Sequence, residues 1–359
     1  MYILGLNIFH GDSSACLLCD GKLIAAAEEE RFRRVKHWAG FPSESIKWCL
    51  SEAKIGLNDI NHISINQDPK ANILKKIIYT MLKRPSLKML LGRFQNKQKR
   101  LSIKEYLLKE FPNSRFTGFI HSVEHHTAHL SSAFHVAPFT KSVVVSVDGF
   151  GDFASSAWGI GTGTKINLDD RVYFPHSLGI FYQALTQFIG FHNYGDEYKV
   201  MGLSSFGTPI YSELIEEKIF KDQKKFKLNL DFFNHTNKNF NYKFSGSPHQ
   251  NQIFNEKIGN LLNLTKNNEK DFVIRQRNIA SSIQKVFEKK LLQICQKIHN
   301  LDYSDNLVYA GGCALNSLAN KKLFESKLFN KIYIPYAPGD AGGSIGSALQ
   351  VIKSKKINI

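Results

Sequence analysis

A short pattern of β-strands occurs twice in the chain, and this repetition constrains the fold more than any other feature. Residues 2–7, 14–18 and 23–27 are apolar runs separated by a His-Gly-Asp-Ser turn and an Asp-Gly turn, which predicts an antiparallel meander. Residues 142–147 and 154–160 repeat the arrangement around an Asp-Gly-Phe-Gly-Asp turn. A motif that recurs in this way indicates two related α/β lobes.

The polar turn inside each meander is a candidate ligand-binding loop. Such turns present backbone N–H groups outward, and one turn per lobe would face a nucleotide held in the cleft between the lobes. Gly-rich segments also follow the strands predicted at residues 306–310 and 331–335, and glycine lets a ligand approach the backbone. A simple tight turn is the alternative. The predicted nucleotide-binding residues in these turns are Asp12, Ser13, Asp148, Gly149, Gly151, Gly311, Gly312, Asn316, Gly342 and Gly343.

Two histidines one helical turn apart form a candidate metal site. His125 and His129 adjoin residues 127–134, which favour a helix, and side chains four residues apart on a helix share a face. Both imidazoles can then bind one ion, although the spacing also fits surface or helix-capping histidines. Asp340, before a Gly-rich helix start, is the predicted third ligand, with a helix N-cap as its alternative role. Two histidines and one carboxylate leave coordination positions open, which suits Fe(II), Mn or Zn.

The remaining segments are predicted as helices, loops and two insertions. We expect an N-terminal lobe over residues 1–140 and a C-terminal lobe over residues 141–359. The first contains a basic helical insertion at about 70–100, and the second a variable insertion at about 209–270. Residues 193–207 are predicted as a polar loop. Further helices are expected over residues 43–53, 103–110, 177–189, 274–298 and 345–352.

Composition narrows the setting. The apolar fraction of 43% is enough for folded cores, while the net charge of +16 is high. We interpret this charge as solvated helix faces, and the alternative is a basic rim that attracts anionic substrates or nucleic acid. Cys16 and Cys19 are interpreted as packing residues in a reducing compartment. There is no signal-peptide pattern and no run as long as a membrane span, so we expect a cytoplasmic protein without membrane contact.

Ordered motifs along nearly the whole chain resemble the O-carbamoyltransferases of nodulation-factor and aminoglycoside-antibiotic biosynthesis. Each motif is weak alone, but together they are highly specific. They are Gly5-Leu6-Asn7 with His10; Glu28-Glu29-Glu30-Arg31-Phe32 through Lys36-His37; Glu124-His125-His126 with Ala128-His129; Asp148-Gly149; Ser177-Leu178-Gly179; Glu197-Tyr198-Lys199-Val200-Met201-Gly202-Leu203; Gly311-Gly312 with Ala314-Leu315-Asn316; and Pro338-Gly339-Asp340-Ala341-Gly342.

The resemblance implies an actin-like, sugar-kinase/Hsp70-type fold of two duplicated lobes. In the family that the chain resembles, this part of the protein binds carbamoyl-adenylate and transfers the carbamoyl group to a hydroxyl. Carried over, His125, His129 and Asp340 would hold a metal, with Fe(II) favoured over Mn or Zn, that touches the nucleotide phosphate. His10 and Lys36 would lie near the carbamoyl group, one as general base and the other as partner of the oxyanion. A solvated lysine is the alternative for Lys36.

Lys199, in one of the shared motifs, is also assigned to the nucleotide. Family members usually continue with a YrdC-like domain that makes carbamoyl-adenylate from carbamoyl phosphate and ATP. We expect that domain to be absent here, so that a separate chain supplies the adenylate. The acceptor is expected to be a small-molecule or sugar hydroxyl, and a homodimer is compatible with the sequence. The alternative functions are an ATP-dependent kinase of the same fold and a tRNA threonylcarbamoyl-modification-type protein, which the positive charge favours slightly.

Overall fold

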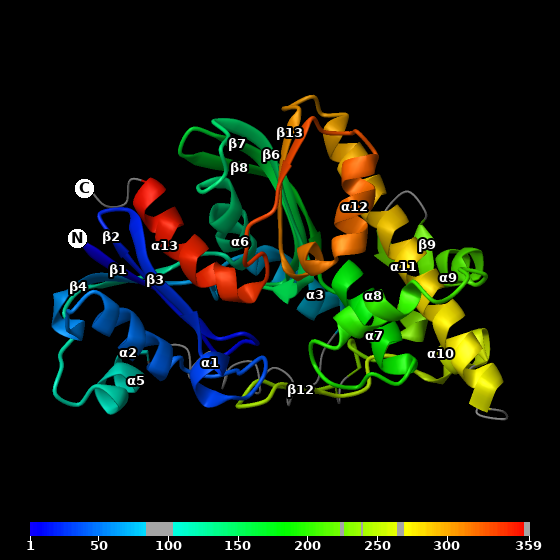
Figure 1. Ribbon diagram of the computed structural model, residues 1–359, viewed down its shortest axis with the longest axis horizontal. Helices are drawn as coiled ribbons and strands as arrows, with labels where there is room; N and C mark the ends of the chain where they lie inside the picture. The colour runs from blue at the N-terminus through cyan, green and yellow to red at the C-terminus, as the bar shows by residue number, and fades with distance from the viewer. Residues whose placement is uncertain (84–102, 223–225, 238–239, 264–268, 355–359) are drawn as a thin grey trace.

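The computed structural model describes residues 1–83, 103–222, 226–237, 240–263 and 269–354. It forms two lobes, each built on a five-stranded sheet (Figure 1). The strand orders are β3-β2-β1-β4-β5 and β14-β13-β6-β7-β8, so the two sheets have the same topology. A meander is followed in each case by two parallel strands. The duplicated actin-like architecture is therefore confirmed, whereas the lobe boundary at residue 140 stays a prediction.

The first sheet owes its buried position to apolar strands. In the meander, β1 (Tyr2–Asn7), β2 (Ser14–Cys19) and β3 (Lys22–Glu28) pair antiparallel, and the side chains of β1 and β2 are almost wholly buried. Two parallel strands, β4 (Ile60–Ile65) and β5 (Phe119–Ser122), extend the sheet from β1. Three helices accompany this lobe, α1 (Glu30–Arg33), α2 (Ser43–Glu52) and α5 (Ile103–Glu110).

The second sheet departs from the prediction at one functional position. The segment 148–152 was predicted as a turn, but β6 (Lys141–Gly151) continues through most of it. Pairing with β7 (Ala154–Thr162) stops at Val147 and resumes at Gly151, and the tight turn lies at Asp152 and Phe153, whose φ angles are 47° and 53° apart from no glycine but positive at 47° and 74°. The irregular pairing frees residues 148–150 to line the interior. The sheet is completed by β8 (Lys165–Tyr173), β13 (Asn306–Ala310) and β14 (Lys331–Tyr333).

Two helices between the sheets join the lobes. Helix α6 (His125–Phe134) packs on β6, β7 and β13 of the second sheet, although it precedes that sheet in the sequence. Helix α13 (Gly343–Lys353), near the other end of the chain, packs on β1, β2 and β4 of the first sheet. The two helices also contact each other, as Figure 1 shows. A Cβ on Gly346 would lie 1.9 Å from the Ala128 carbonyl oxygen, so glycine permits this approach.

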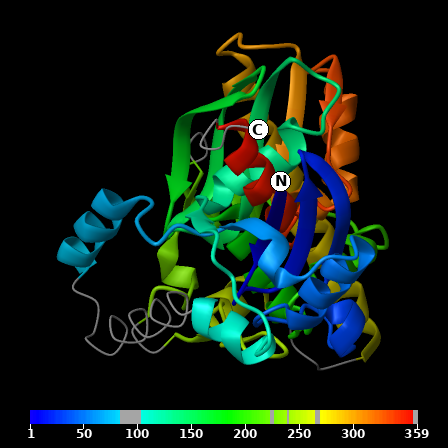
Figure 2. The ribbon, with the colours of Figure 1, turned by 90° about the vertical axis from the view of Figure 1, so that its left-hand side faces the viewer.

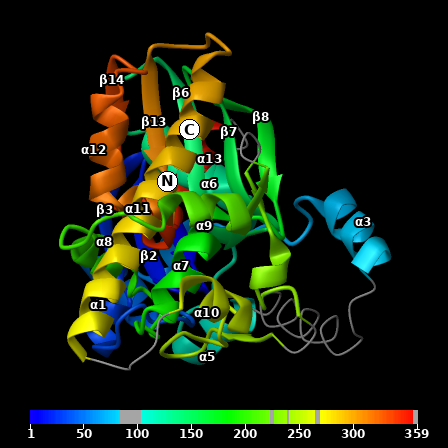
Figure 3. The same ribbon diagram turned by 90° about the vertical axis from the view of Figure 1, so that its right-hand side faces the viewer.

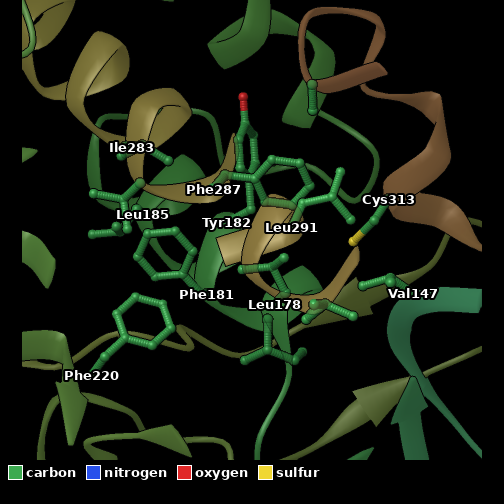
Figure 4. Packing of buried hydrophobic residues seen from close by; sticks show 14 of the residues in the cluster. Val147, Leu178, Phe181, Tyr182, Leu185, Phe220, Ile283, Phe287, Leu291 and Cys313 are labelled. Carbon is green, nitrogen blue, oxygen red and sulfur yellow. The ribbon is translucent and has the colours of Figure 1, made fainter. Parts of the chain in front are cut away.

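The core of the second lobe lies beneath α7 (Leu178–Phe188) and the long helix α11 (Glu269–His299). Figure 4 shows its aromatic centre, where Phe181, Tyr182 and Phe287 lie together, with Tyr182 and Phe287 meeting edge to face at 5.1 Å. The predicted polar loop at 193–207 instead contains α8 (Glu197–Ser204), whose Val200 is buried against α11. Helix α12 (Ser317–Glu325) also packs on α11.

The predicted insertion at 209–270 is folded in its described parts. It contains two short hairpins and two helices, and an isolated bridge pairs its Gly246 with Ala39 of the first lobe. Helix α3 (Ile73–Lys83) lies in the predicted basic insertion, of which residues 84–102 fall outside the described part. None of the described helices is long and apolar enough to cross a membrane. The elements of the second insertion are α9 (Ser212–Ile219), β9 (Phe220–Asp222), β10 (Lys227–Leu228), β11 (Tyr242–Lys243), β12 (His249–Gln250) and α10 (Glu256–Leu262).

Candidate active site

Four side chains from distant parts of the chain converge where α6 meets the start of α13. The Nε2 atoms of His125 and His129 are 3.0 Å apart. Oδ2 of Asp148 lies 2.9 Å from the first and 3.2 Å from the second. Oδ1 of Asp340 lies 3.5 Å from the Nε2 atom of His125 and 3.3 Å from that of His129. The structure thus brings together the three predicted metal ligands and adds a fourth group, Asp148, which the sequence interpretation had assigned to the nucleotide.

This four-residue cluster has the geometry of a metal-binding site. Ligand atoms about 2.1 Å from a common ion lie about 3.0–3.4 Å apart in octahedral or tetrahedral coordination. The measured separations of 2.9–3.5 Å fit that range. The Nδ1 atoms of His125 and His129 have no hydrogen-bond partner, so neither ring is oriented through its far nitrogen. Two imidazoles and two carboxylates are a suitable donor set for Fe, Mn or Zn.

Without an ion, the electrostatics of the cluster are those of two tight ion pairs. Burial lowers the pKa of His129, but Asp148 and Asp340 outweigh it and raise that pKa to about 10. The pKa of His125 is raised by the same carboxylates against burial. Burial raises the pKa of Asp148, yet the two imidazoles hold it well below its usual value. A bound cation would replace these protons, since imidazole binds metals in its neutral form.

Local structure holds the two histidines in place. Helix α6 begins after Glu124, whose Oε2 accepts a hydrogen bond from the backbone N–H of Thr127 at 2.8 Å. The backbone N–H of His125 donates to Oδ2 of Asp152 at 2.9 Å. Gly151 lies against the His125 ring, because a Cβ there would be 2.0 Å from two ring atoms. The ring is therefore wedged between its own helix and β6.

His10 links the cluster to the open part of the site. Its Nδ1 atom lies 3.0 Å from Oδ2 of Asp340, whose other oxygen faces the histidine pair. Its ring stacks on Phe244 at a centroid distance of 5.0 Å and is 16% exposed. If Nδ1 donates to Asp340, Nε2 is left as a proton acceptor.

A cavity of about 640 Å³ opens above these groups. Its walls come from both lobes, and one of them is aromatic, with Tyr194, Tyr198, Tyr242 and Phe244. A cavity of this size suits a nucleotide-sized ligand. Of the predicted site residues, those that line it are His10, Asp12, Lys36, Asp148, Gly149, Gly312, Asn316 and Asp340.

A second group of polar side chains lies at the mouth of the same cavity. The Nδ1 atom of His37 is 2.7 Å from Oδ1 of Asp12, and its backbone N–H donates to Oε2 of Glu30 at 2.7 Å. The hydrogen bond with Asp12 raises the pKa of His37. Burial raises the pKa of Glu197, which lies in the same cavity. This group places a positive imidazole and carboxylates next to Lys36.

Six predicted nucleotide-binding residues do not line the cavity. Ser13 is fully buried and donates its hydroxyl to the carbonyl oxygens of His10 and Gly40, so it braces the first turn. Lys199 pairs with Asp196 at 2.6 Å, because α8 replaces the expected loop and directs it backwards. The four others are glycines that permit close packing on neighbouring groups, namely Gly151 on His125, Gly311 on the Val147 backbone, Gly342 on Ala337 and Gly343 on Asn66.

Sequence reasoning missed the role of Asp148 and the pairing of His37 with Asp12. Asp148 follows a β-branched strand directly, and its Oδ1 accepts a hydrogen bond from the Gly312 N–H at 3.0 Å. An aspartate at the end of a buried strand, with a distant histidine pair in the chain, was the available signal. The aromatic wall had none, because Tyr194, Tyr242 and Phe244 come from segments without a regular pattern.

Comparison with known proteins is consistent with this site. Residues 2–349 match the family model described as Carbamoyltransferase N-terminus, so the chain belongs to the carbamoyltransferase family. It is 34% identical to Uncharacterized protein sll1178 of Synechocystis, over 98% of this chain and 57% of that protein. It is 28% identical to Nodulation protein NolNO of Sinorhizobium fredii, over 96% of this chain and 47% of that protein.

The chain spans about half the length of these curated relatives. Among solved structures, the activator of the 2-hydroxyisocaproyl-CoA dehydratase from Clostridium difficile with bound ADPNP is 13% identical. It covers 100% of this chain and 99% of its own, with a TM-score of 0.48.

Proposed function

We propose that this chain binds carbamoyl-adenylate in the inter-lobe cavity and transfers its carbamoyl group to a hydroxyl of a sugar or other small molecule. The observation that carries the proposal is the position of His10. Its Nδ1 atom contacts Asp340 of the four-residue cluster, and its ring faces the cavity that Lys36 also lines. A proton acceptor, a cation and a candidate metal site therefore surround one space.

The residues of the cluster would hold a divalent transition metal, with Fe(II) favoured over Mn or Zn. His125, His129, Asp148 and Asp340 supply nitrogen and oxygen ligands at mutual distances that suit one ion. When bound, the ion would supply positive charge against the phosphate of the adenylate, which becomes more negative as it leaves. The backbone N–H groups near Gly149 and Gly312 lie at the same end of the cavity.

The transfer itself would be an attack of the acceptor oxygen on the carbamoyl carbon. His10 Nε2 would take the proton of the attacking hydroxyl, and Asp340 would hold the ring and the positive charge that it gains. Lys36 would stabilise the negative carbonyl oxygen of the tetrahedral intermediate. That intermediate then releases AMP, so the new C–O bond to the acceptor replaces the C–O bond to the phosphate and a carbamate ester remains.

The cavity has room for both substrates. Its volume of about 640 Å³ exceeds that of an adenylate, and cavities of about 300–1,000 Å³ are typical for small ligands. The aromatic wall offers flat surfaces for stacking a base or a sugar ring. We propose that the adenylate is made from carbamoyl phosphate and ATP by a YrdC-like domain or chain, and that Lys199 does not take part in binding it, because it is paired with Asp196.

The test supplies carbamoyl-adenylate to the purified chain with a panel of sugar and small-molecule hydroxyl acceptors. We expect equal amounts of AMP and carbamate ester, measured by mass spectrometry. His10→Ala should lower the rate by about two to four orders of magnitude while metal content stays unchanged. Formation of ADP and a phosphate ester from ATP, without a carbamate ester, would instead identify a kinase and refute the proposal.

A further inference from the structure

Helix α3 has its apolar face turned away from the protein. Six apolar side chains of this eleven-residue helix are exposed by 42–76%. At 100° per residue they occupy one half of the helix circumference, and Lys75, Lys76, Tyr79 and Thr80 occupy the other. A surface helix of a globular protein normally buries its apolar face. The exposed residues are Ile73, Leu74, Ile77, Ile78, Met81 and Leu82.

The opposite face is the one that touches the protein. The ammonium of Lys75 lies over the ring of Tyr173, 5.1 Å from its centroid. The ring of Tyr79 meets Phe153 and Phe174 edge to face at 5.7 and 5.1 Å. At the root of the helix, Asn72 donates its side-chain N–H to the Asp152 carbonyl oxygen at 2.9 Å. These contacts fix the orientation, and Figures 2 and 3 show α3 standing away from both lobes.

The sequence around α3 is strongly basic. Residues 70–100 contain ten Lys or Arg and neither Asp nor Glu, against a net charge of +16 for the whole chain. Lys70 precedes the helix and Lys83 ends it, so positive charge flanks the apolar face at both ends. An exposed apolar face together with such charge is typical of helices that lie in the interface of an anionic bilayer.

We propose that α3 docks this protein on an anionic lipid surface, with Leu74, Met81 and Leu82 inserted among the acyl chains. A second copy of the chain fits this face less well, since pairing would bring two stretches of ten positive charges together. Nucleic acid fits it less well too, because phosphates recruit the lysines but leave the apolar side chains in water. The surface differs from a membrane span, for which the described helices are too short or too polar.

The experiment is sedimentation of the purified full chain with lipid vesicles. One set is phosphatidylcholine alone, and the other contains equal parts of phosphatidylcholine and phosphatidylglycerol. We expect binding to the anionic vesicles, at least about tenfold weaker binding to neutral ones, and weakening with added salt. Equal binding to both sets, or none to the anionic set, would overturn the proposal.

Two variants assign any binding to the helix. The triple variant Leu74→Gln, Met81→Gln, Leu82→Gln keeps good helix formers and should bind anionic vesicles at least about tenfold less. The matched control changes the exposed residues Leu108, Ile210 and Phe324 to Gln, and should bind like the wild type. Wild-type binding by the triple variant would refute docking through α3. A lipid-free dimer, or a complex with nucleic acid, that the triple variant abolishes would assign the face to that partner instead.

Discussion

Replacing Gly151 by alanine should empty the candidate metal site without touching a ligand. The added Cβ would lie 2.0 Å from Cγ and Cδ2 of His125, whereas ordinary contacts begin at 3.4 Å. The ring must therefore retreat by about 1.4 Å, while metal–ligand bonds tolerate deviations of about 0.2 Å. We expect metal affinity to fall by at least about 10- to 100-fold. The overpacking should also lower the free energy of unfolding by about 1–3 kcal/mol.

Gly149 provides the matched control, two residues earlier on the same strand. A Cβ there meets nothing within 4 Å, so Gly149→Ala should keep the metal. The assay is elemental analysis of both purified variants, followed by competition with a chelator of known affinity. Circular dichroism establishes that both are folded. Equal metal content and affinity in Gly151→Ala and the wild type would refute the placement of His125 at the ion.

Three further predictions follow from the same structure. His129→Ala should strip the metal and leave the fold largely intact, and unchanged metal by elemental analysis would contradict this. Gly312→Val should weaken AMP binding by at least about tenfold in calorimetry, because its Cβ would lie 2.7 Å from Oδ1 of Asp148 in the cavity wall. His235 is buried and its pKa is lowered to about 4, mainly by burial. Its unfolded form therefore binds more protons between pH 6.5 and 4, so the wild type should lose about 2 kcal/mol more stability than His235→Gln from pH 7 to 5 in urea titrations.

The duplicated fold was predictable because each strand of the two meanders carries its own apolar run and its own turn residues. The strand β13 has the bounds predicted for it, and α2, α5 and α7 differ from their predictions by a residue at most. These are local signals, which survive without knowledge of tertiary contacts. The helix α8 was missed because its moment is weak and its burial depends on contact with α11.

The site was predictable only in part. His125 and His129 share a helical face by spacing alone, and Asp340 stood out beside glycines. The role of Asp148 depends on an interruption in the pairing of β6 with β7, which no residue pattern encodes. Four predicted nucleotide glycines proved to be positions of close packing, since glycine marks close approach to protein and to ligand alike.

The central claim is that the cleft brings a nucleotide phosphate to the four-residue cluster. The most direct measurement is an anomalous diffraction map of the metal-loaded protein crystallised with AMP. We predict one peak within about 2.0–2.3 Å of the Nε2 atoms of His125 and His129, with the AMP phosphate beside His10 in the cavity. A peak away from these histidines, or AMP bound outside the cavity, would contradict the account.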